Sequence, residues 1–228
     1  MSDRSFTITT IVVYGKSVGV PTIATIASTL RPFVLNLEDR QLHSIQSYVA
    51  MLMLWNEKVS LTSITNTNEL LARHFGESFF VRDEIGGDEQ VLADIGTGAG
   101  FPGLALKIVR PNLEIHLIEQ NAKKAAFLAE VVRLLAFERV YVHKTAYEAL
   151  SPETPKFDFV VARALGNYKG LLKWSSDRLE AKNGRALLWL GADEARRLNE
   201  FPGWTWKLPR PIPESQQRVI LVGRPTRK

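Results

Sequence analysis

The sequence predicts an α/β fold built on a mostly parallel sheet with helices on both faces. From Val91 onward, short apolar segments alternate with segments of helical periodicity. Repeated βα units of this length produce parallel strands covered by helices on both sides. The last two apolar segments have no long helix between them, so one of these strands is expected to run antiparallel. Seven strands are expected, at residues 91–96, 114–119, 140–145, 157–163, 185–190, 204–208 and 218–223.

Helices are expected between these strands, at residues 102–110, 121–136, 168–181 and 192–200. The first of them has a proline in its first turn, where the missing N–H costs nothing. Before the sheet, residues 37–59 carry apolar side chains at spacings of three and four, from Leu42 to Trp55, which indicates an amphipathic helix. A second helical segment is expected at about 68–82.

Three regions follow from this pattern. Residues 1–36 are rich in β-branched side chains but show no amphipathic period, so they are expected to form a loosely attached extension of unknown role. Residues 37–87 form a helical cap. Gly86 and Gly87 interrupt the chain and mark the expected boundary to a ligand-binding domain, residues 88–228.

Composition excludes several classes of site. Hydrophobic residues make up 45% of the chain and charged residues 23%, as in ordinary globular proteins. The chain has no cysteine, which excludes disulfides, thiolate nucleophiles and cysteine zinc sites. Its four histidines lack the spacing of metal ligands, so no metal is expected. No apolar run approaches the roughly 20 residues that cross a bilayer, so a cytoplasmic protein without membrane attachment is expected.

The positive charge is concentrated at the C-terminal end. The chain carries a net charge of +5, and residues 204–228 contain six basic residues and one acid, so the remainder is formally neutral. A basic edge of this kind suits a polyanionic partner such as RNA. It equally suits a solvated tail without a partner.

A glycine-rich segment from Asp94 to Gly103 is the strongest indication of a ligand site. It joins the first strand of the sheet to the following helix, where an α/β sheet opens its ligand crevice. Gly96, Gly98 and Gly100 allow positive φ angles and a close approach of the backbone to a ligand. The start of the following helix offers free N–H groups to a carboxylate or phosphate.

Two cofactor classes fit this segment. Gly98, Gly100 and Gly103 satisfy the dinucleotide fingerprint, which keeps NAD open. Glu119 ends the second strand, where an acid accepts the ribose hydroxyls of either NAD or S-adenosylmethionine. Asp94, directly before the glycines, favours S-adenosylmethionine, because it can help to hold a methionine ammonium group that NAD lacks. A glycine-rich turn without any ligand is the third interpretation.

Further motifs beside this segment resemble one family. The chain is similar to the glucose-inhibited division protein B family, the bacterial 16S rRNA guanine-N7 methyltransferases also called RsmG, from about Tyr48 to Gly191. The specific features are the GxGxGFPG form of the loop, Arg73-His74 followed by Ser78, and the Ala-Arg-Ala sequence at 162–164. The supporting motifs lie at residues 54–56, 61–63, 108–111, 123–124 and 127–128.

The resemblance implies a Rossmann-like class I methyltransferase fold, with a mostly parallel seven-stranded sheet flanked by helices and an N-terminal helical extension. It implies S-adenosylmethionine as the cofactor, bound by residues 88–228, with the adenine near Ala146 and Tyr147. Tyr147 stands where the family often has an acid. The expected cofactor-binding residues are Asp94, Gly96, Gly98, Gly100, Phe101, Glu119, Ala146, Tyr147 and Arg163.

The reaction that the resemblance implies is methyl transfer to N7 of a guanine in 16S rRNA, within the small ribosomal subunit or its precursor. N7 carries a free lone pair, so no general base is required and no catalytic residue is expected beyond those that align the reactants. The guanine must be exposed or flipped, because an RNA helix hides N7 in a deep, narrow groove. The expected RNA-binding residues are His74, Lys123, Lys124, Arg163, Arg196 and Arg197, together with the basic tail.

Several alternatives stay open. Arg163 could hold a phosphate, a guanine edge or the cofactor carboxylate, or form an ion pair with a nearby acid. His74 could equally cap or pack between helices. Departures from the family pattern at Ser60, Glu77, Ala162 and Leu190 leave the cofactor loop unchanged but affect the substrate side. The rival functions are a methyltransferase for another RNA, a protein or a small molecule, a non-catalytic RNA-binding relative, and a nicotinamide dehydrogenase.

Overall fold

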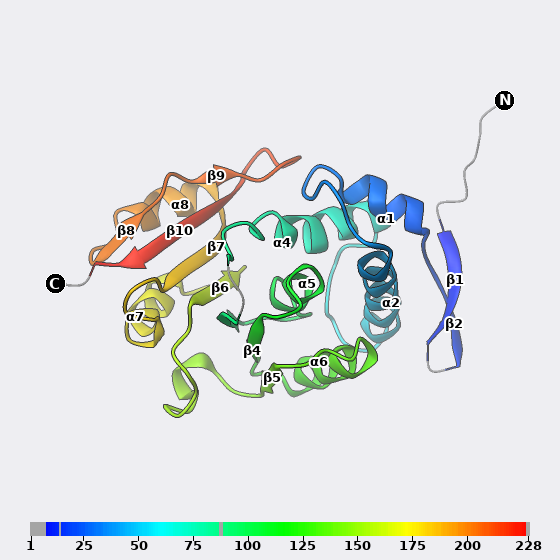
Figure 1. Cartoon of the computed structure of the whole chain (residues 1–228), viewed down its shortest axis with the longest axis horizontal. Helices are drawn as coiled ribbons and strands as arrows, with labels where there is room; N and C mark the ends of the chain where they lie inside the picture. The colour runs from blue at the N-terminus through cyan, green and yellow to red at the C-terminus, as the bar shows by residue number, and fades with distance from the viewer. Residues whose placement is uncertain (1–7, 14, 87–88, 227–228) are drawn as a thin grey trace.

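A computed structural model describes residues 8–13, 15–86 and 89–226. Its main sheet has the strand order β5-β4-β3-β6-β7-β10-β8, with the two-residue strand β9 paired to β10 (Figure 1). The strands from β5 to β7 run parallel, and β10 runs antiparallel to both β7 and β8. The predicted α/β class and the antiparallel end are therefore confirmed. The strands are β3 (Val91–Ile95), β4 (Glu114–Ile118), β5 (Val140–His143), β6 (Phe159–Arg163), β7 (Arg185–Gly191), β8 (Trp204–Trp206), β9 (Arg210–Pro211) and β10 (Arg218–Pro225).

Helices cover both faces of this sheet. On one face lie α5 and α6 with the N-terminal helices beyond them, and on the other lie α7 and α8 (Figure 1). Strand residues alternate between the two apolar clusters, as a strand with both faces buried requires: Leu92 belongs to the first and Ala93 to the second. The helices after β3 are α5 (Gly103–Val109), α6 (Ala122–Leu134), a 3₁₀ turn η2 (Tyr147–Ala149), α7 (Tyr168–Arg178) and α8 (Ala192–Asn199).

The predicted helical cap shares the first apolar cluster with the sheet. Its long helix α2 (Asp39–Asn56) starts with a capping box between Glu38 and Gln41 and buries Ile45, Tyr48 and Leu52. The second helical stretch consists of α3 (Thr67–Leu70), the π-helical segment η1 (Leu71–Gly76) and α4 (Glu77–Phe79). Segments of π-helix are often found at functional sites. The cap packs directly on α5 and α6.

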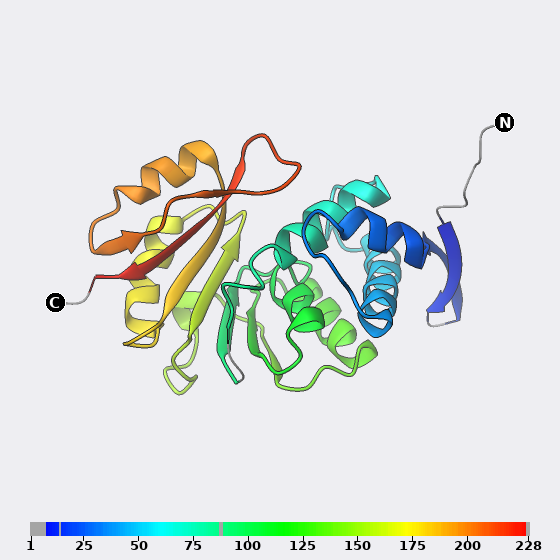
Figure 2. The same ribbon diagram turned by 45° about the horizontal axis from the view of Figure 1, so that its top comes forward.

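The N-terminal region is more ordered than its sequence indicates. Strands β1 (Ile8–Val13) and β2 (Lys16–Pro21) form an antiparallel hairpin at the end of the molecule opposite β8 (Figure 2). Helix α1 (Ile23–Leu30) follows and packs on α2 and η1, with Ile26 and Leu30 fully buried.

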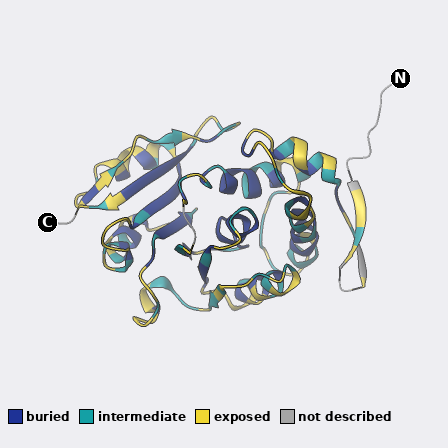
Figure 3. Ribbon diagram, in the orientation of Figure 1, coloured by how far each residue is buried: buried dark blue, intermediate teal, exposed yellow. Residues whose placement is uncertain are grey.

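The expectation of a loosely attached extension is therefore wrong for residues 20–34, whereas β1 is mostly exposed (Figure 3). Residues 1–7 and 14 lie outside the described residues, as do Gly87 of the expected domain boundary and Arg227 and Lys228 of the basic tail.

Candidate functional site

The glycine-rich loop occupies the carboxyl end of β3, and its glycines are required by its shape. Gly96, Gly98 and Gly100 have φ angles of 64°, 60° and 87°, a region that favours glycine. A Cβ added at Gly100 would collide with the hydroxyl of Tyr48, whereas one at Gly98 would have only the Gly96 carbonyl oxygen nearby, at 3.8 Å. The loop is thus closely packed on the cap side and open at Gly98.

Asp94 lies beneath this loop and holds it to the start of α5. Its Oδ2 accepts hydrogen bonds from Thr97 Oγ1 at 2.6 Å and from the Gly103 N–H at 2.7 Å. Its Oδ1 is buried and receives no hydrogen bond from the described residues. Burial raises the pKa of Asp94 to about 6, although both hydrogen bonds and Arg163 oppose the shift. The expectation of a free N–H group at the helix start is wrong at Gly103, because Asp94 already occupies it.

Glu119, directly after β4, reaches across to the same loop. Its Oε2 accepts the Gly98 N–H at 3.0 Å, and its Oε1 accepts the Asn121 N–H at 2.8 Å. Both bonds come from backbone groups, so the carboxylate is held in one orientation. Each carboxylate oxygen has a second lone pair, which leaves room for the two hydroxyls of a ribose. Asp94, the glycines and Glu119 thus form one connected group.

A stack of three rings joins the cap to the loop. Phe101 lies between Tyr48 of α2, with ring centroids 5.2 Å apart, and His74 of η1, at 4.6 Å, and both pairs are nearly parallel. The Tyr48 hydroxyl donates to the Ala99 carbonyl oxygen at 2.6 Å. Tyr48 is not among the site residues that the sequence predicts. Its apolar neighbours at helical spacing made it look like an ordinary core position.

Arg163, at the end of β6, is hydrogen-bonded to the cap. Its Nη1 donates to the Arg73 carbonyl oxygen at 2.7 Å, and its Nη2 donates to His74 Nδ1 at 2.9 Å. Arginine can only donate, so Nδ1 of His74 must be the acceptor and Nε2 of the neutral ring must carry the proton. Nε2 therefore donates to Thr62 Oγ1 at 2.9 Å. Burial, together with Arg163 and Arg73, lowers the pKa of His74 to about 3. His74 is therefore a neutral residue between helices rather than a cation.

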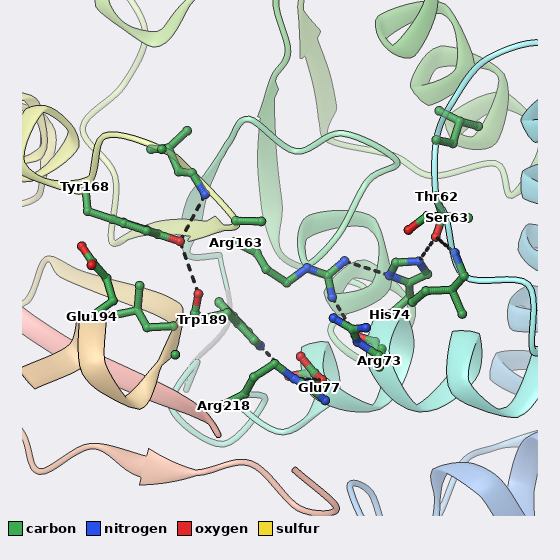
Figure 4. Close-up of a pocket in the computed structure, with 17 residues that line it drawn as sticks. Thr62, Ser63, Arg73, His74, Glu77, Arg163, Tyr168, Trp189, Glu194 and Arg218 are labelled. Atoms are coloured by element: carbon green, nitrogen blue, oxygen red, sulfur yellow. Dashed lines mark hydrogen bonds and ion pairs between the residues drawn. The ribbon is translucent and has the colours of Figure 1, made fainter. Parts of the chain in front are cut away.

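A pocket of about 660 Å³ opens beside this network, at the carboxyl ends of β6 and β7 (Figure 4). Figure 4 shows His74 and Thr62 on one side, Tyr168 and Glu194 on the other, and Glu77 with Arg218 between them. Its volume lies within the range of small-molecule sites, about 300–1,000 Å³. The pocket is lined by residues from the cap, from β6 and the loop after it, from β7, and from the starts of α7, α8 and β10: Leu61, Thr62, Ser63, Ile64, Arg73, His74, Glu77, Arg163, Ala164, Leu165, Gly166, Tyr168, Trp189, Leu190, Gly191, Glu194 and Arg218.

The remaining predicted residues lie around this centre. Ala146 and Tyr147 follow β5, and the Tyr147 ring packs edge-on against Trp174 of α7, with centroids 5.4 Å apart. Burial, followed by Glu148, raises the pKa of Tyr147 to about 12. Lys123 and Lys124 occupy the first turn of α6, where the Asn121 side chain accepts both of their backbone N–H groups.

The basic residues near the C-terminus are largely paired. On α8, Arg196 pairs with Asp193, and Arg197 pairs with Glu194 at 3.5 Å. In the tail, three cations reach back to two acids of the cap region: Lys207 and Arg210 to Glu84, and Arg218 to Glu77. The basic edge indicated by the sequence is therefore partly used to attach the last strands to the cap.

Within the described residues, no cluster of three or more histidine or acidic side chains could hold a metal ion. The same part of the chain contains no helix that is both long and apolar enough to cross a membrane.

Comparison with known proteins gives one consistent family. The family model described as rRNA small subunit methyltransferase G (GidB) matches residues 41–204. Ribosomal RNA small subunit methyltransferase G of Roseiflexus sp. (strain RS-1) is 37% identical over 171 residues, covering 74% of this chain and 73% of that protein. The protein of the same name from Photobacterium profundum is 31% identical over 191 residues, covering 82% and 91%.

Solved structures agree on the fold. A precorrin-6y C5,15-methyltransferase from Geobacter metallireducens GS-15 aligns with a TM-score of 0.55 at 16% identity, covering 70% of this chain and 89% of that chain. The glycopeptide N-methyltransferase MtfA, solved with S-adenosyl-L-homocysteine, aligns with a TM-score of 0.56 at 12% identity, covering 65% and 88%. At these identities the likeness concerns the Rossmann-like methyltransferase fold alone.

Proposed function

The chain belongs to the rRNA small subunit methyltransferase G family, and from this membership we propose that it transfers a methyl group from S-adenosylmethionine to N7 of a guanine in 16S rRNA. The reaction takes place in the cytoplasm, on the small ribosomal subunit or its precursor. The observation that carries the proposal is the joining of two sites: the glycine loop with Glu119, and the pocket at β6 and β7. Phe101, His74 and Arg163 connect them.

The residues around the loop fit this cofactor. Glu119 accepts the ribose hydroxyls with the lone pairs that its backbone partners leave free. Asp94 Oδ1 is a buried acceptor without a donor among the described residues, a costly arrangement that the donors of a methionine ammonium group would relieve. Gly98 leaves open space for the cofactor, and Gly96, Gly100 and Phe101 shape the loop. Ala146 and Tyr147 border the adenine.

S-adenosylmethionine supplies an electrophilic methyl group on a sulfonium. Because the guanine N7 lone pair is already free, the protein has no proton to remove, and its contribution is to align the two reactants and exclude water. His74 is neutral and fully engaged with Arg163 and Thr62, which suits a positioning role rather than acid–base chemistry. Arg163 lines the pocket and has more N–H donors than the two that it uses for Arg73 and His74.

RNA binding is assigned to the rim of the two sites. Lys123 and Lys124 lie at the first turn of α6, close to Glu119 through Asn121. Arg196 and Arg197 lie on α8 beside the pocket residue Glu194. Arg163 and His74 line the pocket itself, so Arg163 is assigned to the target nucleotide rather than to distant phosphates, and His74 keeps Arg163 in position.

The test is transfer of labelled methyl from S-adenosylmethionine to small ribosomal subunits from cells that lack the native guanine-N7 enzyme. The modified position is mapped by cleavage at 7-methylguanine. Wild-type protein should label one guanine of 16S rRNA. Glu119→Ala should abolish labelling and weaken cofactor binding by about 10-fold to 100-fold, because charged hydrogen bonds to the ribose are lost.

Glu153→Ala removes an exposed acid and serves as the matched control, with wild-type labelling expected. Absence of label with tight cofactor binding intact would remove the rRNA substrate from the proposal. Equal labelling by the Glu119→Ala variant would remove Glu119 from the cofactor site.

A further inference from the structure

The pocket beside Arg163 contains one buried carboxylate that methyl transfer itself does not use. Glu77 of α4 is 3% exposed and lines the pocket wall. Its Oε1 accepts a hydrogen bond from Arg218 Nε at 2.7 Å. Oε1 is the one Glu77 side-chain oxygen with a hydrogen bond among the described residues, and Oε2 is not among the buried atoms that lack a partner, so Oε2 is accessible from the pocket. A carboxylate oxygen that is open to the pocket and has free lone pairs can accept hydrogen bonds from the donors of a ligand.

Neighbouring contacts hold this carboxylate in a single orientation. Trp189 Nε1 donates to the Glu77 carbonyl oxygen at 2.8 Å, which attaches β7 to the start of α4. Arg218 comes from β10 and holds the side-chain oxygen Oε1 of Glu77. Three separate elements thus meet at Glu77. An acceptor held in this way cannot reorient to suit different ligands, so it can discriminate between them.

The other polar groups of the pocket are less suitable as free acceptors. The Tyr168 hydroxyl donates to the Trp189 carbonyl oxygen and accepts from the Leu165 N–H. Glu194 pairs with Arg197, and its side chain is 38% exposed. Glu77 is therefore the pocket carboxylate that is itself largely buried, is held by Arg218 and keeps one oxygen free to accept from a ligand.

The atom that is methylated, N7, limits which bases Glu77 would have to distinguish. Only purines have an N7, so a methyltransferase directed at N7 must distinguish guanine from adenine. On the Watson–Crick edge, guanine presents two neighbouring donors, N1–H and the N2 amino group, whereas adenine presents an acceptor beside its single amino group. A flipped base is read on this edge. A carboxylate accepts both guanine donors and repels the adenine acceptor.

We propose that Glu77, held by Arg218, accepts the N1–H and N2 amino donors of a flipped guanine and so determines the choice of base. The inference rests on the proposed methyl transfer to N7 and adds the specificity residue to it. N7 lies on the opposite edge of the base from these donors, so recognition at Glu77 leaves N7 free for reaction.

The test compares guanine with inosine, which keeps N7 and N1–H but lacks the N2 amino group. RNA carrying one or the other at the mapped methylation site is assayed for kcat/KM with wild type and with Glu77→Gln. Wild type should prefer guanine by about 10-fold to 100-fold, the effect of one hydrogen bond to a charged acceptor. In Glu77→Gln the amide oxygen keeps the bond to Arg218 and turns an NH₂ donor to the pocket, so the guanine-to-inosine ratio should fall to about one.

Glu194→Gln, the other pocket carboxylate, is the matched control and should keep the wild-type ratio. Thermal unfolding of Glu77→Gln should resemble that of wild type, because the bond to Arg218 is retained. A wild-type ratio in Glu77→Gln, or a collapse of the ratio in Glu194→Gln instead, overturns the assignment.

A binding measurement separates this inference from the proposed function. Guanosine, inosine and adenosine monophosphates are titrated by calorimetry into the protein saturated with S-adenosylhomocysteine. Preference for the guanine nucleotide, lost in Glu77→Gln, supports Glu77 even if no rRNA is methylated. Equal affinity for all three nucleotides in wild type overturns the role of Glu77 even if rRNA methylation succeeds.

Discussion

At the scale of single residues, the contacts of the candidate site depend on His74 remaining uncharged. His74 sits in contact with Arg163 and near Arg73, and its ring stacks on Phe101. These surroundings, burial first, lower its pKa from 6.5 to about 3. A protonated His74 would lose its bond from Arg163 and face two positive charges. The ring stack and the Arg163 network therefore require the neutral form.

This has a consequence for stability at acidic pH. The unfolded chain binds a proton at His74 below about pH 6.5, whereas the folded chain does so only near pH 3, so this residue lowers stability as the pH falls through that window. His74→Asn keeps an acceptor for Arg163 but cannot titrate. Between pH 6 and pH 4 its free energy of unfolding should fall less steeply than that of wild type, by up to about 1.4 kcal/mol per pH unit.

Urea denaturation at several pH values measures this difference. His43→Asn, at an exposed position of α2, is the control and should follow the wild-type pH dependence. Comparison of variants is required because Asp94, with its raised pKa, contributes in the opposite direction: it favours the folded state as the pH falls below about 6. Identical slopes for His74→Asn and wild type would contradict the neutral assignment.

Residue-level prediction from sequence succeeded where the signal is local. The loop glycines, Asp94 and Glu119 follow from a short motif and the strand ends around it, and the structure brings them together. Tyr48 and the Glu77–Arg218 pair had no such signal. The Tyr48–Ala99 bond spans 51 positions, and the Glu77–Arg218 bond spans 141. Contacts of this kind arise from the topology of the sheet and cap, which a single sequence does not contain.

At the scale of elements, the parallel strands were predictable and the N-terminal elements were not. Short apolar segments between longer helices give a repeated pattern in the sequence. Each of the seven strands predicted in this part of the chain is present in the structure. Helix α1 has only eight residues, too few to show a period, and its buried positions Ile26 and Leu30 are separated by a single helical turn. Its place under the cap is decided by tertiary packing on α2 and η1.

The importance of α1 can be measured with one pair of leucines. Leu30 is fully buried in the first apolar cluster, whereas Leu35, five residues later, is 77% exposed. Leu30→Ala should lower the free energy of unfolding by about 2–5 kcal/mol, since it removes buried methyl groups and leaves a cavity. Leu35→Ala should change it by no more than about 0.5 kcal/mol. Equal, small effects in chemical denaturation would mean that α1 is detached from the core in solution.

At the scale of the whole molecule, the distribution of unpaired positive charge ranks the residues that we propose for RNA binding. Arg196 and Arg197 are paired with acids on their own helix, as are Lys207 and Arg218 with acids of the cap region. Lys123 and Lys124 have no ion pair among the described residues. The sequence places the positive charge at the C-terminal end. In the fold, however, several of these cations pair with acids of distant elements, so fewer of them are free to bind phosphates.

The lysines should therefore contribute more to RNA affinity than the arginines of α8. Lys123→Glu with Lys124→Glu should weaken binding to 16S rRNA and reduce the slope of log affinity against log salt by about two, one for each phosphate that a lysine no longer neutralises. Arg196→Ala with Arg197→Ala should change the slope by less, because Asp193 and Glu194 already neutralise these side chains. Filter binding across a salt series measures both. An equal change of slope in the two double variants would contradict this ranking.

The shared core of cap and sheet bears on how this protein can be recombined with its relatives. The helices of residues 39–79 and one face of the sheet bury their side chains in one continuous cluster, in which Tyr48, Phe75, Phe101 and Trp189 belong together. The cap is consequently not an interchangeable module. A chimera that receives the cap of a relative only about a third identical in sequence would place foreign side chains against α5, α6 and β7. Cap and sheet must be exchanged together, and the contacts at Tyr48 and Glu77 are the positions where a mismatch would reach the candidate site.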